Sequence, residues 1–78
     1  MTIINMAMTE KITGLSKSVI TRRTKNKIFA KNLGEGMHRT IRYCMEDVIA
    51  CVEIFNASSS KKEAQDKIRE YYENKSTI

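Results

Sequence analysis

The sequence predicts an all-α protein made of a short N-terminal helix and a helical hairpin. Three features of the 78-residue chain support this prediction. Gly34 and Gly36 mark the end of one element and the start of another. The apolar residues that follow recur with the period of a helix, and a serine-rich loop further on carries a helix-capping motif. A chain of this length supports one domain, which we expect to comprise residues 1–78.

The segment from Met37 to Phe55 has the residue pattern of an amphipathic helix. On a helical wheel at about 100° per residue, most of its apolar side chains fall on one arc of about 160°. A narrow charged strip borders this arc and consists of Arg39, Arg42, Glu46 and Glu53. A smaller apolar patch beyond the strip contains Tyr43, Ala50 and Ile54. We therefore expect this helix to have apolar neighbours on two sides.

A second helix is expected to begin at Lys61. Ser60 and Glu63 have the spacing of a capping box, in which the two residues satisfy each other's free backbone N–H groups. Apolar residues then follow at helical spacing, namely Ala64, Ile68, Tyr71 and Tyr72, and the helix is expected to fray near Asn74. The two helices would form a hairpin over about residues 37–74.

The alternative prediction is an α+β fold with a small antiparallel sheet and a C-terminal helix. Good strand formers are frequent in the same central segment, including Ile41, Tyr43, Val48 and Val52. A strand pair here would turn at Glu46-Asp47, a dipeptide without the glycine or asparagine that tight hairpins favour. Both architectures stay open at this point.

In the N-terminal part we expect a short helix over residues 9–20. It is broken at Gly14 and begins again after Ser16, which caps the new start. The following segment, from Thr21 to Lys27, contains no apolar residue. We expect this segment to contribute nothing to a core.

Charge divides the chain more clearly than any loop. Residues 1–34 contain seven basic residues and one acidic residue, whereas residues 35–78 contain seven basic and eight acidic residues. Clusters of lysine and arginine attract phosphates, and arginine adds a two-pronged contact. The sequence therefore predicts a basic N-terminal segment, about residues 1–34, that binds DNA or RNA. The predicted contacts are Lys17, Arg22, Arg23, Lys25, Lys27 and Lys31.

The nine residues from Gly14 to Arg22 resemble the turn and the start of the recognition helix in helix-turn-helix DNA-binding proteins. That family has a small residue four positions before the glycine, where this chain has Glu10. Apolar packing residues continue its recognition helix, where Arg23 and Thr24 stand here. The motif is therefore incomplete.

Catalysis is not expected. His38 is the only histidine, and Cys44 and Cys51 lie in the apolar arc, where buried thiols are inert. A zinc site needs about four ligands at short paired spacings, which this chain does not offer. We expect neither an enzyme, nor a metal site, nor a cofactor.

The apolar arc of the central helix predicts a contact surface for a second copy or another partner. Its members are Ile41, Met45, Val48, Val52 and Phe55. A homodimer would cover this arc, and a monomeric three-helix domain is the alternative. In functional terms we expect a small basic regulatory protein that binds nucleic acid. The second hypothesis is an inhibitor or adaptor, of the sort that phages and mobile elements encode, directed at a host protein.

The longest apolar run, Val48 to Val52, is far shorter than the roughly 20 residues of a transmembrane helix. The first eight residues also have no basic residue ahead of the apolar ones, as a secretory signal would. We therefore expect no membrane association and a cytoplasmic location.

Overall fold

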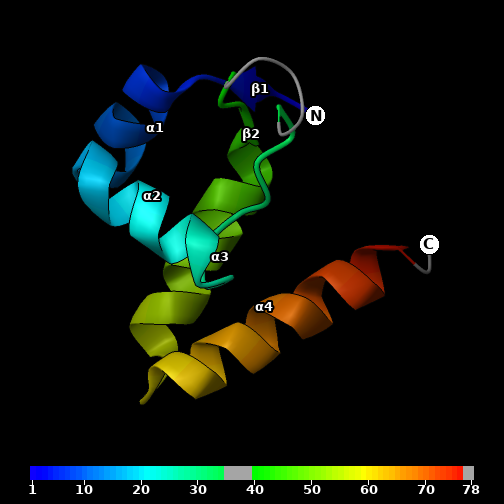
Figure 1. The fold of residues 1–78 in the computed structure, drawn as a ribbon. Coiled ribbons are helices and arrows are strands. Elements are labelled where there is room, and N and C mark those ends of the chain that lie inside the picture. Colours follow the sequence, from blue (N-terminus) through cyan, green and yellow to red (C-terminus); the bar gives the residue numbers. More distant parts are fainter. Residues whose placement is uncertain (35–39, 77–78) are drawn as a thin grey trace.

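Four helices and one short antiparallel sheet make up the regular structure of residues 1–34 and 40–76, the part of the chain that the computed structural model describes (Figure 1). In chain order the elements are β1 (Ile3–Ile4), α1 (Met6–Thr13), α2 (Lys17–Lys25), β2 (Tyr43–Cys44), α3 (Met45–Ala57) and α4 (Lys61–Ser76). The mainly helical class predicted from the sequence is confirmed. A small antiparallel sheet, as in the alternative prediction, is also present, but it pairs the N-terminus with residues 43–44, and the turn predicted at Glu46-Asp47 is the first turn of α3 instead.

Local capping signals define the first two helices. The Asn5 side chain accepts a hydrogen bond from the Met8 N–H group (2.9 Å) and caps the start of α1. Gly14 ends α1 in the left-handed conformation, with φ of 72°, and its N–H group donates to the Glu10 carbonyl. Ser16 then caps α2 by accepting from the Val19 N–H group. The predicted break at Gly14 and the restart behind Ser16 are confirmed, although α1 begins earlier than expected.

The predicted start of the central helix at Met37 is wrong. Residues 40–44 are not helical, and α3 begins at Met45. Residues 37–39 lie outside the described part. The backbone around β2 is used by distant segments: Ile3 pairs with Cys44, the Met45 N–H group donates to the Thr2 carbonyl, and the Arg42 carbonyl accepts from Leu33. Backbone groups engaged in this way are not available to extend α3 toward the N-terminus.

The helical hairpin is confirmed. Ser60 accepts a hydrogen bond from the Glu63 N–H group (3.1 Å), as the capping box predicts. The Glu63 carboxylate, however, accepts from the N–H group and the hydroxyl of Ser59 instead of the N–H group of Ser60. These bonds lower the pKa of Glu63 to about 2. At the other end of the hairpin, Lys75 near the end of α4 pairs with Asp47 in the first turn of α3.

The core lies where α2, β2 and the hairpin meet, and it includes a stretch that the sequence placed in the basic segment. Ile28, Phe29 and Ala30 are buried together with Ile20, Tyr43, Val48, Cys51, Ala64 and Ile68. The Phe29 ring meets Tyr43 edge to face, with centroids 5.3 Å apart. The Tyr43 hydroxyl in turn shares a hydrogen bond of 2.7 Å with the Thr24 hydroxyl. Tyr43 thus joins α2 to the buried stretch of residues 28–30.

Candidate nucleic-acid interface

Helix α2 carries the first group of predicted contacts on one exposed side. Ile20 is fully buried and anchors the helix. Lys17, Arg22 and Lys25 are exposed, together with Ser18 and Thr21. At about 100° per residue these five positions fall on one arc of about 140°. The arc therefore combines three cations with two hydroxyl groups, which are donors suited to phosphate oxygens.

Arg23 does not belong to this exposed arc. Its guanidinium carbon lies 3.8 Å from the centroid of the Phe55 ring in α3, and the residue is half-buried. Burial, followed by the neighbouring charge of Arg22, lowers the pKa of Arg23. The expectation that residues 21–27 contribute nothing to the interior is thus wrong at Arg23 and at Thr24, which binds Tyr43. Polar groups fill the inward positions where the helix-turn-helix pattern has apolar residues.

The remaining predicted contacts lie along a groove that begins at the end of α2. Lys25, Lys27 and Lys31 line one side of it, and Arg69 of α4 lines the other side. The groove has a volume of about 1310 Å³. Lys27 adopts a left-handed conformation, with φ of 60°, which turns the chain out of α2.

Two hydrogen bonds join the walls of the groove. The Gln65 side-chain amide of α4 donates to the Asn26 carbonyl (3.1 Å), and the Lys31 N–H group donates to the Tyr72 hydroxyl (2.9 Å). The Lys31 ammonium lies 4.6 Å from the centroid of the same Tyr72 ring. Both walls are therefore fixed relative to each other without any ligand.

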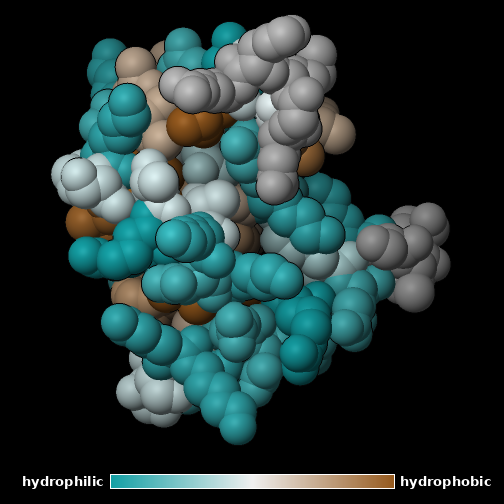
Figure 2. Space-filling view, in the orientation of Figure 1, coloured by the Kyte–Doolittle hydropathy of each residue, from teal (hydrophilic) through white to brown (hydrophobic). Residues whose placement is uncertain are grey.

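The cations of this region lack acidic partners. None of the six predicted contact residues forms an ion pair with a carboxylate of residues 1–34 and 40–76. Further along α4, by contrast, Lys67, Arg69 and Lys75 pair with acids, whereas Lys61 and Lys62 at its start form no ion pair with the described residues. We call Lys17, Arg22, Lys25, Lys27 and Lys31 the basic surface. In Figure 2 largely hydrophilic side chains cover the visible face from the position of α2 across to α4.

Most side chains of the predicted partner interface on the central helix pack against the core of the same chain. Val48 has no exposed surface, and Ile41, Met45, Val52 and Phe55 are half-buried against the same core. The large apolar side chains that are exposed lie elsewhere; within the described residues they are Met1, Ile3, Met8, Ile12, Leu33 and Ile49. Of these exposed side chains, Ile49 alone lies in α3.

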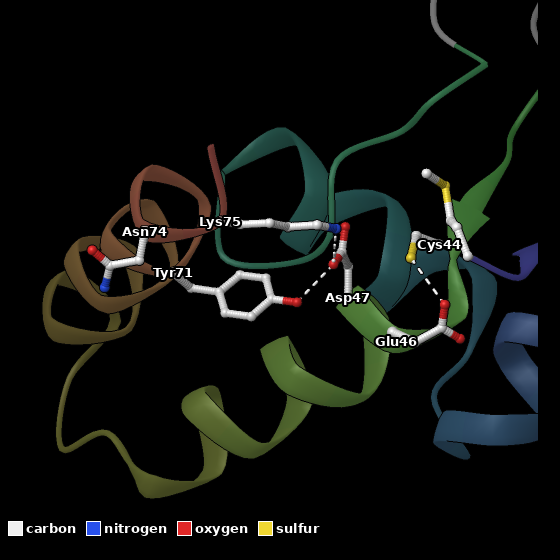
Figure 3. A pocket seen from close by; sticks show the side chains of 7 residues that line it. Cys44, Glu46, Asp47, Tyr71, Asn74 and Lys75 are labelled. Carbon is white, nitrogen blue, oxygen red and sulfur yellow. Dashed lines mark hydrogen bonds and ion pairs between the residues drawn. The ribbon is translucent and has the colours of Figure 1, made fainter. Parts of the chain in front are cut away.

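A second polar cluster, which sequence reasoning missed, ties the ends of the hairpin together (Figure 3). Asp47 is only 4% exposed, and its Oδ1 atom accepts hydrogen bonds of 2.7 Å from both Tyr71 and Lys75. Burial acts to raise the pKa of Asp47, but the bonds from Lys75 and Tyr71 outweigh it and leave the pKa lowered. Tyr71 and Lys75 are four residues apart in α4, and this spacing on one helix face is the only sequence signal for the cluster.

A small cavity of about 500 Å³ adjoins this cluster and is lined in part by Cys44 and Glu46. The Cys44 thiol donates to the Glu46 carboxylate over 3.6 Å, and both cysteines are free and buried. Burial, followed by the charge of Asp47, raises the pKa of Cys51 to about 12. A thiol of this kind stays protonated and unreactive at neutral pH.

Metal ligands do not gather in the described part of the chain: no group of three or more His, Cys, Asp or Glu side chains there has an arrangement that would hold an ion. His38, on which any acid–base scheme would depend, lies outside the described residues. Of the helices present in residues 1–34 and 40–76, none is long and apolar enough to cross a membrane.

Comparison with known proteins gives no relative from which to carry over a function. No family model, no curated protein and no solved structure matches this chain.

Proposed function

We propose that this protein is a small regulatory protein that binds nucleic acid through the basic surface. The observation that carries the proposal is a run of positive charges without acidic partners. Five lysine and arginine side chains follow one another from α2 into the groove, and no carboxylate of the described residues pairs with them. Uncompensated cations on one side of a protein create a positive potential that attracts polyanions. Phosphate contacts release counterions and so supply much of the binding free energy.

The local shape of the N-terminal part supports the same function. Helices α1 and α2 are joined by a three-residue turn with Gly14 in the left-handed conformation, as in helix-turn-helix units. The helix that follows this turn exposes cations and hydroxyl groups and is anchored by one buried residue, Ile20. A helix so held projects its polar side chains away from the core, where they can reach phosphates and base edges.

The direct test is the salt dependence of binding. Fluorescence anisotropy with labelled DNA and RNA should show affinity that falls linearly on a log–log plot against salt, with a slope of about −3.5 to −4.5 for five phosphate contacts. The triple variant Lys17→Gln, Arg22→Gln, Lys25→Gln should reduce the magnitude of this slope by about 2 to 3. Circular dichroism should show that its helix content is unchanged, since all three side chains are exposed.

A charge-matched control keeps the test specific. The variant Lys11→Gln, Lys61→Gln, Lys62→Gln removes the same charge from exposed positions outside the basic surface. We expect its salt slope to match that of the parent. Equal losses in both variants, or no binding of nucleic acid by the parent, would contradict the proposal.

A further inference from the structure

The groove between residues 24–33 and α4 has features that the exposed side of α2 lacks. It is concave and its floor is apolar; lysines line one wall, and the other wall carries Arg69 together with its ion-pair partner Glu73. Phe29 and Ile68 close its bottom and are almost fully buried, whereas the Tyr72 ring is half-buried and Leu33 is 49% exposed. About half of the Leu33 side chain is open to solvent, so a ligand that covers it gains apolar contact.

We infer that this groove binds single-stranded nucleic acid, an inference that rests on the proposed function and names its substrate class. In a duplex the base faces are stacked inside, and two rows of phosphates face outward on a convex cylinder. A duplex would therefore meet the rims of a concave groove and leave its floor uncovered. A single strand carries phosphates along one edge and free base faces along the other, which matches cationic rims above an apolar floor.

The contact between Lys31 and Tyr72 is replaced by a contact between a base and Tyr72 when the strand binds. In the free protein the Lys31 ammonium lies over the Tyr72 ring. A base that stacks on this ring takes the place of the ammonium, and the ammonium moves to a phosphate on the rim. The Lys31 backbone does not have to move, because its N–H group is held by the Tyr72 hydroxyl. The ring is thus already positioned for stacking.

Arg69 provides the cation of the opposite wall, although nothing in the sequence distinguishes it from the other basic residues of the hairpin. It pairs with Asp66 (3.2 Å) and Glu73 (3.9 Å), and its side chain is 68% exposed. Ion pairs exposed to this extent contribute little to the stability of the protein, so Arg69 can leave its acidic partners and bind a phosphate at little cost. Gln65, one helical turn before Arg69, keeps the wall in place through its bond to Asn26.

The experiment compares one labelled thymidine oligonucleotide of about 15 nucleotides with the same strand annealed to its complement. We expect the single strand to bind at least about tenfold more tightly, by fluorescence anisotropy at fixed salt. Leu33→Ser should weaken single-strand binding about fivefold, because the apolar contact between Leu33 and a base is lost. Arg69→Gln should reduce the salt slope by about 0.7. Lys67→Gln removes a cation two residues away that pairs with Glu63 and does not line the groove, and it should leave binding unchanged.

The outcomes separate this inference from the proposed function. If duplex and single strand bind equally and Leu33→Ser and Arg69→Gln have no effect, the inference is wrong, while losses in the α2 variant would still support the proposed function. If neither nucleic acid binds but labelled polyglutamate does, both proposals are wrong and the groove accepts an acidic protein segment. If Leu33→Ser does not fold, Arg69→Gln alone decides, because its side chain lies on the surface.

Discussion

The Arg23 guanidinium packs against the Phe55 ring at 3.8 Å and so joins α2 to the last turn of α3. Arg22, its neighbour in sequence, is exposed and belongs to the basic surface. Two adjacent arginines of the same cluster thus have different roles: one holds the helix that the other uses for binding.

We therefore predict opposite effects for the two arginines. Arg23→Ser should lower the free energy of unfolding by about 1 kcal/mol, because a partly desolvated cation–π contact is lost. Arg22→Ser should leave unfolding unchanged within about 0.5 kcal/mol and weaken nucleic-acid binding instead. Urea titrations and anisotropy on both variants check this. Equal unfolding midpoints for the two variants would show that the contact with Phe55 does not stabilise the protein.

Val48 and Ile49 make a second adjacent pair with different environments in α3. Val48 has no exposed surface, and Ile49 is 43% exposed. Val48→Asp should cost about 4 kcal/mol or more, because it buries a carboxylate without a partner, and that cost rivals the stability of a typical small domain. Ile49→Lys should change stability by less than about 0.5 kcal/mol. Circular dichroism melts check both, and a folded Val48→Asp would contradict the position of α3 in the core.

Asp47 makes stability depend on pH in the acid range. The pKa of Asp47 is lower in the folded state than in the unfolded state. The ionised Asp47 carboxylate therefore stabilises the folded state above about pH 4, and this stabilisation is lost as pH falls through the folded pKa. The Glu63 carboxylate, with a pKa of about 2, acts in the same direction. Urea midpoints should therefore decline below about pH 4 for the parent protein. Asp47→Asn should be less stable at neutral pH, and its midpoint should decline less steeply in acid. Parallel pH profiles would mean that the bonds from Tyr71 and Lys75 have no net effect on stability.

Two glycines are required for different reasons. At Gly14 an added Cβ meets nothing within 4 Å, but φ is 72°, so Gly14→Ala should cost about 1 kcal/mol through backbone strain alone. At Gly34 the Cβ would lie 2.1 Å from the Thr40 carbonyl oxygen, and backbone would have to shift. Gly34→Ala should therefore cost more than about 2 kcal/mol. The order of the two melting temperatures tests this, and a Gly34→Ala variant as stable as the parent would show that residues 34 and 40 do not approach each other.

The features that the sequence predicted correctly depend on neighbouring residues. Gly14, Ser16 and the box from Ser60 to Glu63 act within one helical turn, so their signals can be read in a short window. The features that it missed depend on contacts across the chain. The start of α3 is set by pairing between residues 3–4 and 43–44, which no local pattern of the central segment records.

The candidate site divides in the same way. Charge alone identified the cations of the basic surface, because an excess of lysine and arginine is visible in composition. It did not reveal that Arg23 turns inward, since the ring that it covers is 32 residues away in the chain. Nor did it reveal that Arg69 faces Lys31 across the groove, because that relationship requires α4 to lie beside residues 24–33.

Lys27 links stability and binding most directly, since it is the one non-glycine residue of the described part with a positive φ. Its side chain lines the groove, while its backbone turns the chain from α2 toward the buried Ile28.

A left-handed conformation costs a lysine about 1 kcal/mol relative to glycine. Lys27→Gly should therefore raise the free energy of unfolding by about 0.5 to 1 kcal/mol and at the same time reduce the salt slope of binding by about 0.7 to 0.9. Lys25→Gly, at the last residue of α2, provides the contrast: it removes the same charge but should not raise stability, because Lys25 has an ordinary helical backbone. Urea titration and anisotropy on the two variants measure both quantities. A loss of stability in Lys27→Gly would show that the turn at Lys27 is not strained, and an unchanged salt slope would remove Lys27 from the basic surface.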